Sequence, residues 1–354
     1  MPSRISRLQE RLNGEGIHGM LITSGPNIRY LSGFSGSAGA LMVRDGEATL
    51  YTDSRYAIQA EEETRGVGVR IVSGVAAAAA LSEDRGGGRI AFESEIISVA
   101  GHERLRAIMK DGDLVPVDGQ VEALREIKEP GEVAAIEASL RVTAEAFEEG
   151  ARSAVEGATE LEVAASIERA MREKGASAPA FESIVGSGPR GALPHARATS
   201  RRLARGEPVV VDIGAMVNGY ASDMTRTLFV AEADSRGREV HEAVAGAVRR
   251  AEEAVRDGIP VSDVDAAARE HLLASTFAEH AYGHGTGHGI GLEVHESPRV
   301  AGGRTERLRE GMVLTIEPGV YIPGWGGVRI EDVVLVEKEG CRLLTPTPKE
   351  LRAA

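Results

Sequence analysis

Three histidines lie within a glycine-rich stretch, GHGTGHGIGLEVHE, at residues 283–296. His284 and His288 have the spacing of two ligands on one helix, but the alternating glycines exclude a helix, since each costs about 1 kcal/mol relative to alanine. In an extended chain the two rings share a face and lie about 13 Å apart, because a strand rises about 3.3 Å per residue. One ion cannot bind both. We therefore predict one direct metal ligand and one helper, with a bare glycine face that another backbone can approach closely.

Two other interpretations of this stretch are less consistent with its residues. A phosphate-binding loop of the GxGxxG type does not fit, because after Gly283 and Gly285 the third glycine would stand where His288 is. A flexible solvent loop accommodates the glycines but gives no reason for three clustered histidines. The residue types therefore favour a metal-binding segment.

A pair of aspartates occurs in a predicted hairpin at residues 208–230, PVVVDIGAMVNGYASDMTRTLFV. A two-residue turn at either Val217–Asn218 or Asn218–Gly219 directs Asp212 and Asp223 to the same face. The first turn makes them direct opposites, with Cβ atoms about 5 Å apart. At about 4 Å two like charges repel by about 1 kcal/mol in water and by roughly 4 kcal/mol at an effective dielectric of about 20. Such a pair needs a compensating positive charge.

A second predicted hairpin, formed by MVLTIEPGVYI and GVRIEDVVLVEKEG, repeats this arrangement. If the chain turns about Gly324, Glu317 and Glu331 are direct opposites and share a face. Arg329 lies on that face too, because residues two apart on a strand point the same way.

Four carboxylates and one histidine together indicate a two-metal site, since two divalent cations balance four ionised acids. Oxygen-rich sites with one imidazole suit Mn²⁺, and Co²⁺, Fe²⁺ or Zn²⁺ can substitute. Two ions about 3.5–4 Å apart generate hydroxide near neutral pH and polarise a carbonyl. For any single acid, a solvated strand edge or a salt bridge is the simpler explanation. The shared faces favour metal binding for the set.

The elements that must position these residues form two predicted domains. Residues 1–122 alternate short apolar runs with helical patterns and indicate an α/β domain. The charged segment LREIKEPGEV marks the boundary, and residues 123–354 are predicted to open with two helices and continue as hairpins with further helices. The stretch SGPNIRYLSGF is expected to form a turn followed by a strand, although Asn27 and Tyr30 could contact a ligand.

Bulk composition excludes several classes of protein. The formal net charge of −13 argues against a nucleic-acid partner, because phosphate binding needs clustered Lys and Arg. The single cysteine, Cys341, excludes an intrachain disulfide and fits a reducing compartment. The first residues predict an amphipathic helix and not a signal peptide, and no apolar run is long enough to span a membrane. We therefore expect a cytoplasmic protein without a membrane partner.

The motifs VDIGAMVNGYASDMTRT, GHGTGHGIGLEVHE, TIEPGVY and RIEDVV resemble the M24 metallopeptidase family, which holds prolidase, aminopeptidase P and methionine aminopeptidase. The segments YLSGFSGSAGALMV and TDSRYAIQAEEE are similar to the additional domain of its proline-specific branch. The resemblance implies a creatinase-type N-terminal α/β domain. It also implies a C-terminal "pita-bread" catalytic domain, in which a curved antiparallel sheet has helices outside and metals on its concave face.

The resemblance also implies roles for individual residues. The metal ligands would be Asp212, Asp223, His288, Glu317 and Glu331. His195 matches a residue that contacts the reacting carbonyl, and His284 one that contacts the proline side of the substrate. His295 matches a residue that stabilises the tetrahedral intermediate. Arg329 resembles a residue that holds the active-site network, and Glu317 one that also carries a proton.

The expected function is therefore a metal-dependent exopeptidase that hydrolyses the bond between an N-terminal residue and proline. The expected nucleophile is a hydroxide that bridges two metal ions. The chain length favours a Xaa-Pro dipeptidase of the prolidase type, and the alternative is a Xaa-Pro aminopeptidase acting on longer peptides. A non-catalytic binding module on the same fold and a creatinase-like hydrolase are disfavoured, because relatives of those kinds work without the ligand set found here. A homodimer is the family expectation.

Overall fold

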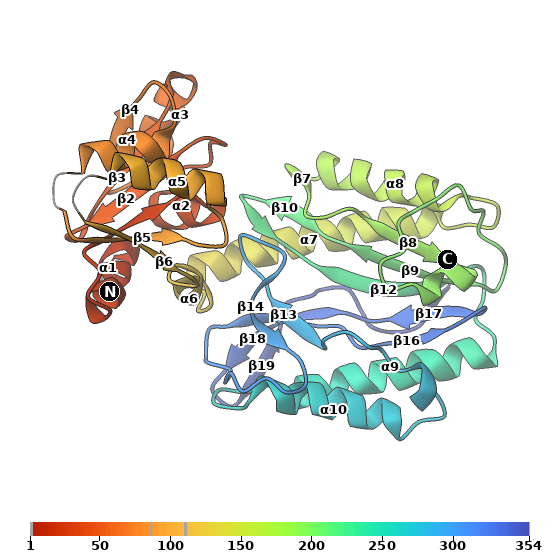
Figure 1. Cartoon of the computed structure of the whole chain (residues 1–354). Helices are drawn as coiled ribbons and strands as arrows, with labels where there is room; N and C mark the ends of the chain where they lie inside the picture. The colour runs from red at the N-terminus through yellow and green to blue at the C-terminus, as the bar shows by residue number, and fades with distance from the viewer. Residues whose placement is uncertain (1–2, 85–86, 110–111, 354) are drawn as a thin grey trace. The chain divides into compact units, whose positions relative to one another are not determined.

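The protein is described by a computed structural model that covers residues 3–84, 87–109 and 112–353 (Figure 1). The chain divides into two compact units, Met1–Arg125 and Glu126–Ala354. Within the covered ranges, no helix combines the length and the apolar character that crossing a bilayer requires.

The first unit is a six-stranded sheet with helices packed on it. Its strand order is β4-β3-β2-β1-β5-β6, in which β2 is antiparallel to β1 and β3 and the other pairs are parallel. This is the α/β class that the sequence predicts. The elements are α1 Arg4–Gly14, β1 Gly19–Ile22, α2 Gly25–Ser32, β2 Ala40–Arg44, β3 Glu47–Thr52, η1 Ser54–Tyr56, α3 Ala57–Glu63, β4 Gly68–Ile71, α4 Ala76–Glu83, β5 Arg89–Glu93, α5 Val99–Ile108, β6 Asp113–Val117 and α6 Glu122–Arg125.

One local prediction in this unit is wrong. The stretch expected to be a turn and a strand is the helix α2. A proline lies in its first turn, and Gly33 ends it with a φ of 87°, a left-handed conformation that suits glycine after a helix. These end signals outweigh the aromatic and β-branched residues between them. Asn27 and Tyr30 are both buried, so neither is open to a ligand.

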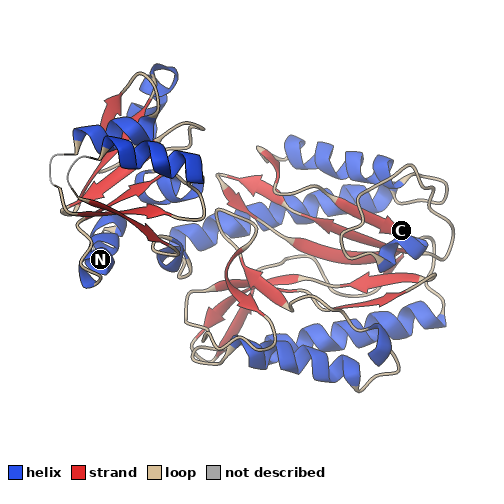
Figure 2. Cartoon of the chain, viewed as in Figure 1, coloured by secondary structure: helices blue, strands red, loops and turns tan. Residues whose placement is uncertain are grey.

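The second unit is a layered arrangement in which helices enclose strands (Figures 1 and 2). Helices α7 and α8 cover one side, and α9 and α10 cover the other. The larger sheets have the orders β20-β12-β9-β8 and β14-β13-β15-β18-β19, and the smaller ones are β11-β10-β7 and β16-β17. Apart from the parallel pair β12–β20, the strand pairs are antiparallel.

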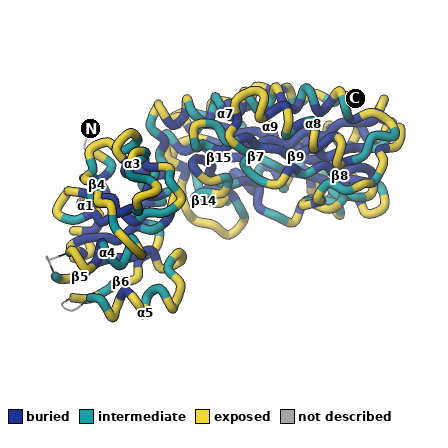
Figure 3. The backbone as a smooth tube through the Cα atoms, turned by 90° about the horizontal axis from the view of Figure 1, so that it is seen from above, coloured by how far each residue is buried: buried dark blue, intermediate teal, exposed yellow. Residues whose placement is uncertain are grey.

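The elements of the second unit are α7 Pro130–Ser153, α8 Glu160–Glu173, β7 Ala178–Pro179, β8 Ile184–Ser187, η2 Gly188–Ala192, β9 Pro208–Ile213, β10 Ala215–Val217, β11 Tyr220–Ala221, β12 Met224–Phe229, α9 Ser235–Ala254, α10 Val261–Leu273, η3 Ala278–His280, β13 Gly287–Gly289, β14 Glu296–Val300, β15 Val313–Ile316, β16 Gly319–Ile322, β17 Gly326–Arg329, β18 Asp332–Glu337, β19 Gly340–Leu343 and β20 Arg352–Ala353. Figure 3 shows that β9 and β15 are largely buried.

The strands that carry the predicted acids have one apolar face and one polar face. In β9, Val211 and Ile213 belong to the core that includes residues of α7 and α8, so Asp212 between them points the other way. Ile330 belongs to the core that includes residues of α9 and α10, and Glu331 follows it on the opposite face. Both cores therefore lie under helices, while the acids face the space between the layers.

Helix α8 begins at a capping box. The backbone N–H of Glu162 donates to Thr159 Oγ1 at 3.2 Å, and the backbone N–H of Thr159 donates to Glu162 Oε2 at 2.7 Å. This reciprocal pair fixes the first turn of the helix. Glu160 lies in that turn and is fully buried, with 0% of its surface exposed.

Candidate metal centre

The first hairpin takes the second of the two predicted registers. Its turn residues Asn218 and Gly219 have φ angles of 51° and 79°, as a two-residue turn with two left-handed positions requires. Asp212 therefore pairs with Thr225. Asp223 lies two residues before Thr225, so it shares the face of Asp212 as a diagonal neighbour and not as a direct opposite.

In the second hairpin, the strand pairs on either side of Glu317 and Glu331 have the register that the sequence predicts. Ile316 pairs with Asp332 in one half, and Gly319 pairs with Arg329 in the other. Glu317 and Glu331 therefore lie opposite each other at the break between the two strand pairs, β15–β18 and β16–β17. Their backbone N–H groups donate instead to neighbouring strands and loops, Glu317 to Thr286 O at 2.8 Å and Glu331 to Thr225 O at 3.0 Å. These two bonds bring both hairpins and the glycine-histidine segment to one point.

A compact cluster of side chains that can ligate a metal forms at that point. Ligand atoms of Asp223, His288 and Glu331 all lie within 4.8 Å of one another. His288 Nδ1 is 2.9 Å from the carbonyl of Gly289, and because a carbonyl can only accept, Nδ1 carries the proton. The unprotonated Nε2 lies 3.7 Å from Asp223 Oδ2 and 3.5 Å from Glu317 Oε1. Its lone pair is thus directed at the acids, as metal ligation requires.

Asp212 lies at the edge of this cluster. Its Oδ2 accepts a hydrogen bond from Arg329 Nη2 at 2.6 Å. Its Oδ1 is buried and makes no hydrogen bond to any of the described residues. A buried carboxylate oxygen without a donor is costly, so this atom needs a cation or water. The structure therefore gathers all five predicted ligands, with Asp212 and Glu317 beside the group of three.

The electrostatics of the cluster also favour a cation. Burial, and then repulsion from Glu331, Asp212 and Glu317, raises the pKa of Asp223 well above its usual value. Burial and the charges of Glu317 and Asp212 likewise raise the pKa of Glu331. Burial raises the pKa of Glu317 to about 7. Arg329 alone does not balance these acids, whereas divalent cations bound by oxygen and imidazole ligands fit the donor set.

His284 is held in a chain of hydrogen bonds outside the cluster. Arg329 Nη1 donates to Tyr321 Oη at 2.9 Å, and Tyr321 Oη lies 3.0 Å from His284 Nε2. Because His284 Nδ1 donates to Gly285 O at 2.8 Å, its Nε2 accepts from the tyrosine. Burial lowers the pKa of His284 to about 4, so the ring is neutral at neutral pH. Its Nδ1 is 3.9 Å from Glu317 Oε2, so His284 lies beside the cluster, whereas His288 lies within it.

The two remaining predicted histidines lie at the exposed side of the site. The ring of His295 packs edge-on against the ring of His288, with centroids 4.4 Å apart. His195 is exposed on a loop whose preceding residue, Pro194, accepts a hydrogen bond from Arg329 Nη1 at 3.1 Å. The same arginine therefore contacts Asp212 and the loop of His195.

Two glycines allow the histidine segment to pack as it does. A Cβ atom on Gly287 would lie 1.8 Å from the backbone oxygen of Thr315, and one on Gly289 would lie 2.2 Å from that of Ser297. Neither position can carry a side chain without moving a strand. The close approach of another backbone, expected from the bare glycine face, is therefore present on both sides of His288.

Several supporting residues were not identified from the sequence. Thr225 Oγ1 donates to Glu331 Oε2 at 2.7 Å and accepts from Arg329 Nε at 3.1 Å. Behind the hairpin, Arg226 Nη1 donates to the carbonyl oxygen of Glu331 at 2.7 Å, and Arg226 also forms an ion pair with Asp332 at 2.7 Å. The sequence signal was available, because Thr225 and Arg226 interrupt an apolar strand just as the aspartates do.

The sequence as a whole matches two known families. Residues 134–338 match metallopeptidase family M24, and residues 4–127 match the creatinase/prolidase N-terminal domain. The first match covers more than half of the chain, which therefore belongs to metallopeptidase family M24.

Individual relatives match over the whole length of the chain. It is 37% identical to the Xaa-Pro dipeptidase of Pyrococcus horikoshii over 352 residues, which are 99% of this chain and 99% of that protein. The structure of the Xaa-Pro dipeptidase from Bacillus anthracis superimposes with a TM-score of 0.95 at 34% identity, covering 99% of both chains. The structure of the X-Pro aminopeptidase from Thermotoga maritima gives a TM-score of 0.91 at 35% identity, covering 99% of this chain and 100% of that one.

Proposed function

We propose that this protein is a metal-dependent Xaa-Pro dipeptidase, which hydrolyses the bond between an N-terminal residue and a C-terminal proline. The observation that carries the proposal is the convergence of Asp223, His288 and Glu331 within 4.8 Å, beside a buried oxygen of Asp212 that accepts no hydrogen bond from the described residues. Full-length similarity to Xaa-Pro dipeptidases supports the substrate class.

The five predicted residues are assigned as ligands of two divalent cations. The set contains four carboxylates and one imidazole, and this excess of oxygen ligands suits Mn²⁺ better than a softer ion. Cations bound there supply hydroxide near neutral pH and polarise the scissile carbonyl. Arg329 holds Asp212 in place and offsets part of its charge through the 2.6 Å contact.

The surrounding side chains are assigned to substrate binding and proton transfer. Glu317 lies 3.5 Å from His288 and 3.9 Å from His284, so its carboxylate spans the site and can pass a proton to the leaving group. His195 and His295 are both exposed; we assign His195 to contact with the reacting carbonyl and His295 to stabilisation of the tetrahedral intermediate. His284, neutral and oriented by Tyr321, is assigned to the proline side.

The chemistry of proline explains the value of such a site. A peptide bond to proline has no N–H, so a peptidase that grips the scissile N–H loses a contact there. A site that acts on the carbonyl and protonates the ring nitrogen does not need that contact. The preference for proline over other residues rests on the similarity to Xaa-Pro dipeptidases.

The decisive assay compares an Xaa-Pro dipeptide with an Xaa-Pro-Yaa tripeptide, each with Mn²⁺, Co²⁺ and Zn²⁺ in turn. We expect rapid hydrolysis of the dipeptide, slow hydrolysis of the tripeptide and the highest rate with Mn²⁺. Faster cleavage of the tripeptide would instead identify an aminopeptidase. No cleavage of either peptide with any of the metals would refute both assignments.

Three further features are part of the proposal. We assign residues 123–354 as the catalytic domain and residues 1–122 as a separate N-terminal domain. We also expect a homodimer, which sedimentation equilibrium tests directly, and a cytoplasmic location, which the single cysteine favours.

A further inference from the structure

A single buried carboxylate closes the loop that carries His195. The loop runs between the end of β8 at Ser187 and Thr199. Glu160, at the start of α8, lies fully buried beneath both ends of this loop. The segment between them contains the short turn η2, and Arg197 forms an isolated antiparallel bridge with Ile184 of β8.

Each oxygen of Glu160 binds one end of the loop. Oε1 accepts from the backbone N–H of Ser187 at 2.9 Å and from its hydroxyl at 2.8 Å. Oε2 accepts from the backbone N–H of Thr199 at 2.9 Å and from its hydroxyl at 2.7 Å. Burial by itself raises the pKa of Glu160, but the hydrogen bonds from Thr199 and Ser187 outweigh it and lower the pKa, so the group stays ionised.

The interior of the loop is tied to the same carboxylate and to the metal centre. Arg190 Nε lies 3.1 Å from Glu160 Oε2, and Arg190 Nη2 donates to the carbonyl of Arg197 at 2.5 Å. Pro194 accepts from Arg329, the residue that also binds Asp212. The loop that carries His195 is therefore held at both ends by Glu160 and in its middle by Arg190. Arg329 holds Pro194, the residue that precedes His195.

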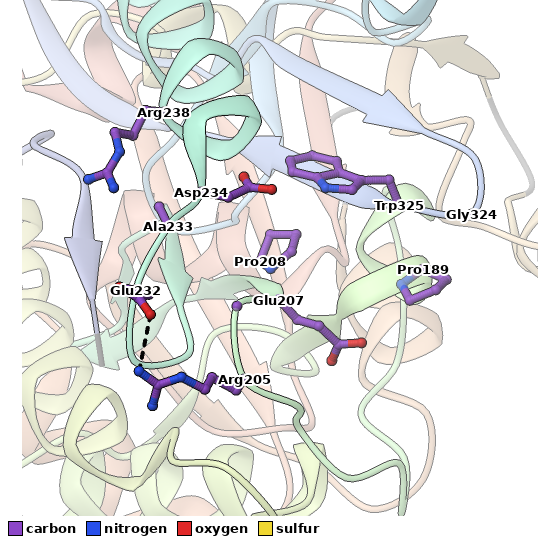
Figure 4. Close-up of a pocket in the computed structure, with 11 residues that line it drawn as sticks. Pro189, Arg205, Glu207, Pro208, Glu232, Ala233, Asp234, Arg238, Gly324 and Trp325 are labelled. Atoms are coloured by element: carbon purple, nitrogen blue, oxygen red, sulfur yellow. Dashed lines mark hydrogen bonds and ion pairs between the residues drawn. The ribbon is translucent and has the colours of Figure 1, made fainter.

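The outer side of the loop has a separate support. Arg201 Nη1 donates to Ser187 Oγ at 2.7 Å and to Glu207 Oε2 at 2.8 Å. Glu207 lines a surface pocket of about 640 Å³ together with Pro189 and Trp325 (Figure 4). None of the residues that line this pocket is a predicted metal ligand.

We propose that Glu160 is a positioning residue for substrate binding, which sets the location of His195 by closing the 187–199 loop. The inference deepens the proposed function, since it assumes that His195 contacts the substrate. Among the described residues, the side chain of Glu160 bonds to Ser187, Arg190 and Thr199, none of which is a predicted metal ligand. Its loss should therefore weaken substrate binding and leave the metal in place.

The test compares Glu160→Gln with a matched control, Glu93→Gln. Glu93 is also buried and accepts backbone N–H groups, but it lies in the first unit. Both variants should lose stability, because an amide nitrogen cannot accept these bonds. Only Glu160→Gln should raise KM for the dipeptide, by about tenfold. A small displacement of a group that positions the substrate can lower enzyme activity by up to about 100-fold. The affinity for Mn²⁺, measured by calorimetry, should equal that of the wild type. A KM equal to that of the wild type, in contrast, would refute the proposal.

A double-mutant cycle with His195→Ala separates positioning from a general loss of structure. If Glu160 acts through His195, Glu160→Gln should change kcat/KM by less than about twofold in the His195→Ala background, because the shared contact is already lost. If Glu160 has only a structural role, Glu160→Gln should change kcat/KM by the same factor in the His195→Ala background as in the wild type. That additive result would overturn the proposal.

A milder variant keeps the proposal testable if Glu160→Gln does not fold. Thr199→Val removes one hydroxyl bond to Glu160 and keeps the side-chain shape; it should raise KM about threefold and increase hydrogen exchange across residues 188–199. Thr52→Val, which removes a buried hydroxyl bond to Ala38 in the first unit, is its control. If the wild type cleaves no Xaa-Pro dipeptide, the proposed function fails, and unchanged exchange in Thr199→Val would separately refute the loop closure.

Discussion

Glu93 in the first unit and the acids of the ligand cluster in the second are buried in opposite ways. In the first unit, Glu93 accepts backbone N–H groups of Thr23 at 2.6 Å and Ser24 at 2.7 Å, and the side-chain amide of Asn27 at 2.7 Å. In the second, the acids of the ligand cluster face one another, and Asp212 keeps one oxygen without a donor among the described residues.

This difference distinguishes a structural acid from a ligand. Burial raises the pKa of Glu93, but the groups next to it are mainly donors that lower it again. Burial also raises the pKa of Asp223, and there the next contributions are three other carboxylates that raise it further. A buried carboxylate that accepts hydrogen bonds is stabilised without a cation. Buried carboxylates that face one another repel, and they need a positive charge between them.

The largest expected effect comes from removing a ligand. Glu331→Ala and His288→Ala should each lose bound metal and more activity than the roughly 10–100-fold that supporting residues cost. The fold should be retained in circular dichroism, because neither side chain is part of a hydrophobic core. Glu93→Gln, in contrast, should keep its metal and activity and lose about 1–3 kcal/mol of stability. Full activity in either ligand variant would erase the distinction between the two sites.

The second effect separates the ligands from the residues around them. His195→Ala should lower kcat/KM by about 100-fold, through a higher KM as well as a lower kcat, since it removes a polar contact to the carbonyl of the bound substrate. Metal content, measured by atomic absorption, should equal that of the wild type. Loss of metal in this variant would place His195 among the ligands.

A smaller effect is expected from the hydroxyl beneath Glu331. Thr225→Val removes the 2.7 Å hydrogen bond to that carboxylate and should weaken metal binding about tenfold in a calorimetric titration. Thr227→Val is the matched control, because its buried hydroxyl is 3.0 Å from a backbone oxygen of Arg329 and contacts no acid. Equal losses in the two variants would mean that Thr225 supports the strand and not the ligand.

The smallest effect concerns the pH dependence of stability without metal. The pKa of Glu317 is raised from 4.5 to about 7 by burial, so the folded, metal-free protein binds this proton more tightly than the unfolded chain. The resulting stabilisation is complete below pH 4.5 and is lost as the pH rises through about 7. In chelator, the Tm of the wild type relative to that of Glu317→Gln should fall by on the order of 5 °C between about pH 5.5 and about pH 7.5. The comparison isolates Glu317, because His284 and His288, whose lowered pKa values act in the opposite sense, are present in both proteins. With Mn²⁺ the Tm of the wild type should rise with pH, because metal binding requires ionised ligands; a relative Tm that does not fall in chelator would contradict the prediction.

Much of the site could be predicted because the faces of a strand alternate with a period of two. Any two-residue turn in the first hairpin places Asp212 and Asp223 on one face, so the shared face was predictable while the register was not. Asn218 and Gly219 decide the register, since both adopt left-handed angles. The residue types of α2 favour a strand, and only its end signals, Pro26 in the first turn and Gly33 after the last, indicate a helix.

The sequence by itself determined which residues can bind metal, which strand faces they occupy and which glycines must be bare. These properties follow from covalent geometry and side-chain chemistry within single segments. Only the tertiary structure decided that the hairpins meet at Glu331 N–H and Thr225 O, that Arg329 pairs with Asp212, and that Glu160 closes the loop of His195. Those contacts join residues far apart in the chain, and their formation depends on how the helices pack against both outer faces of the sheets.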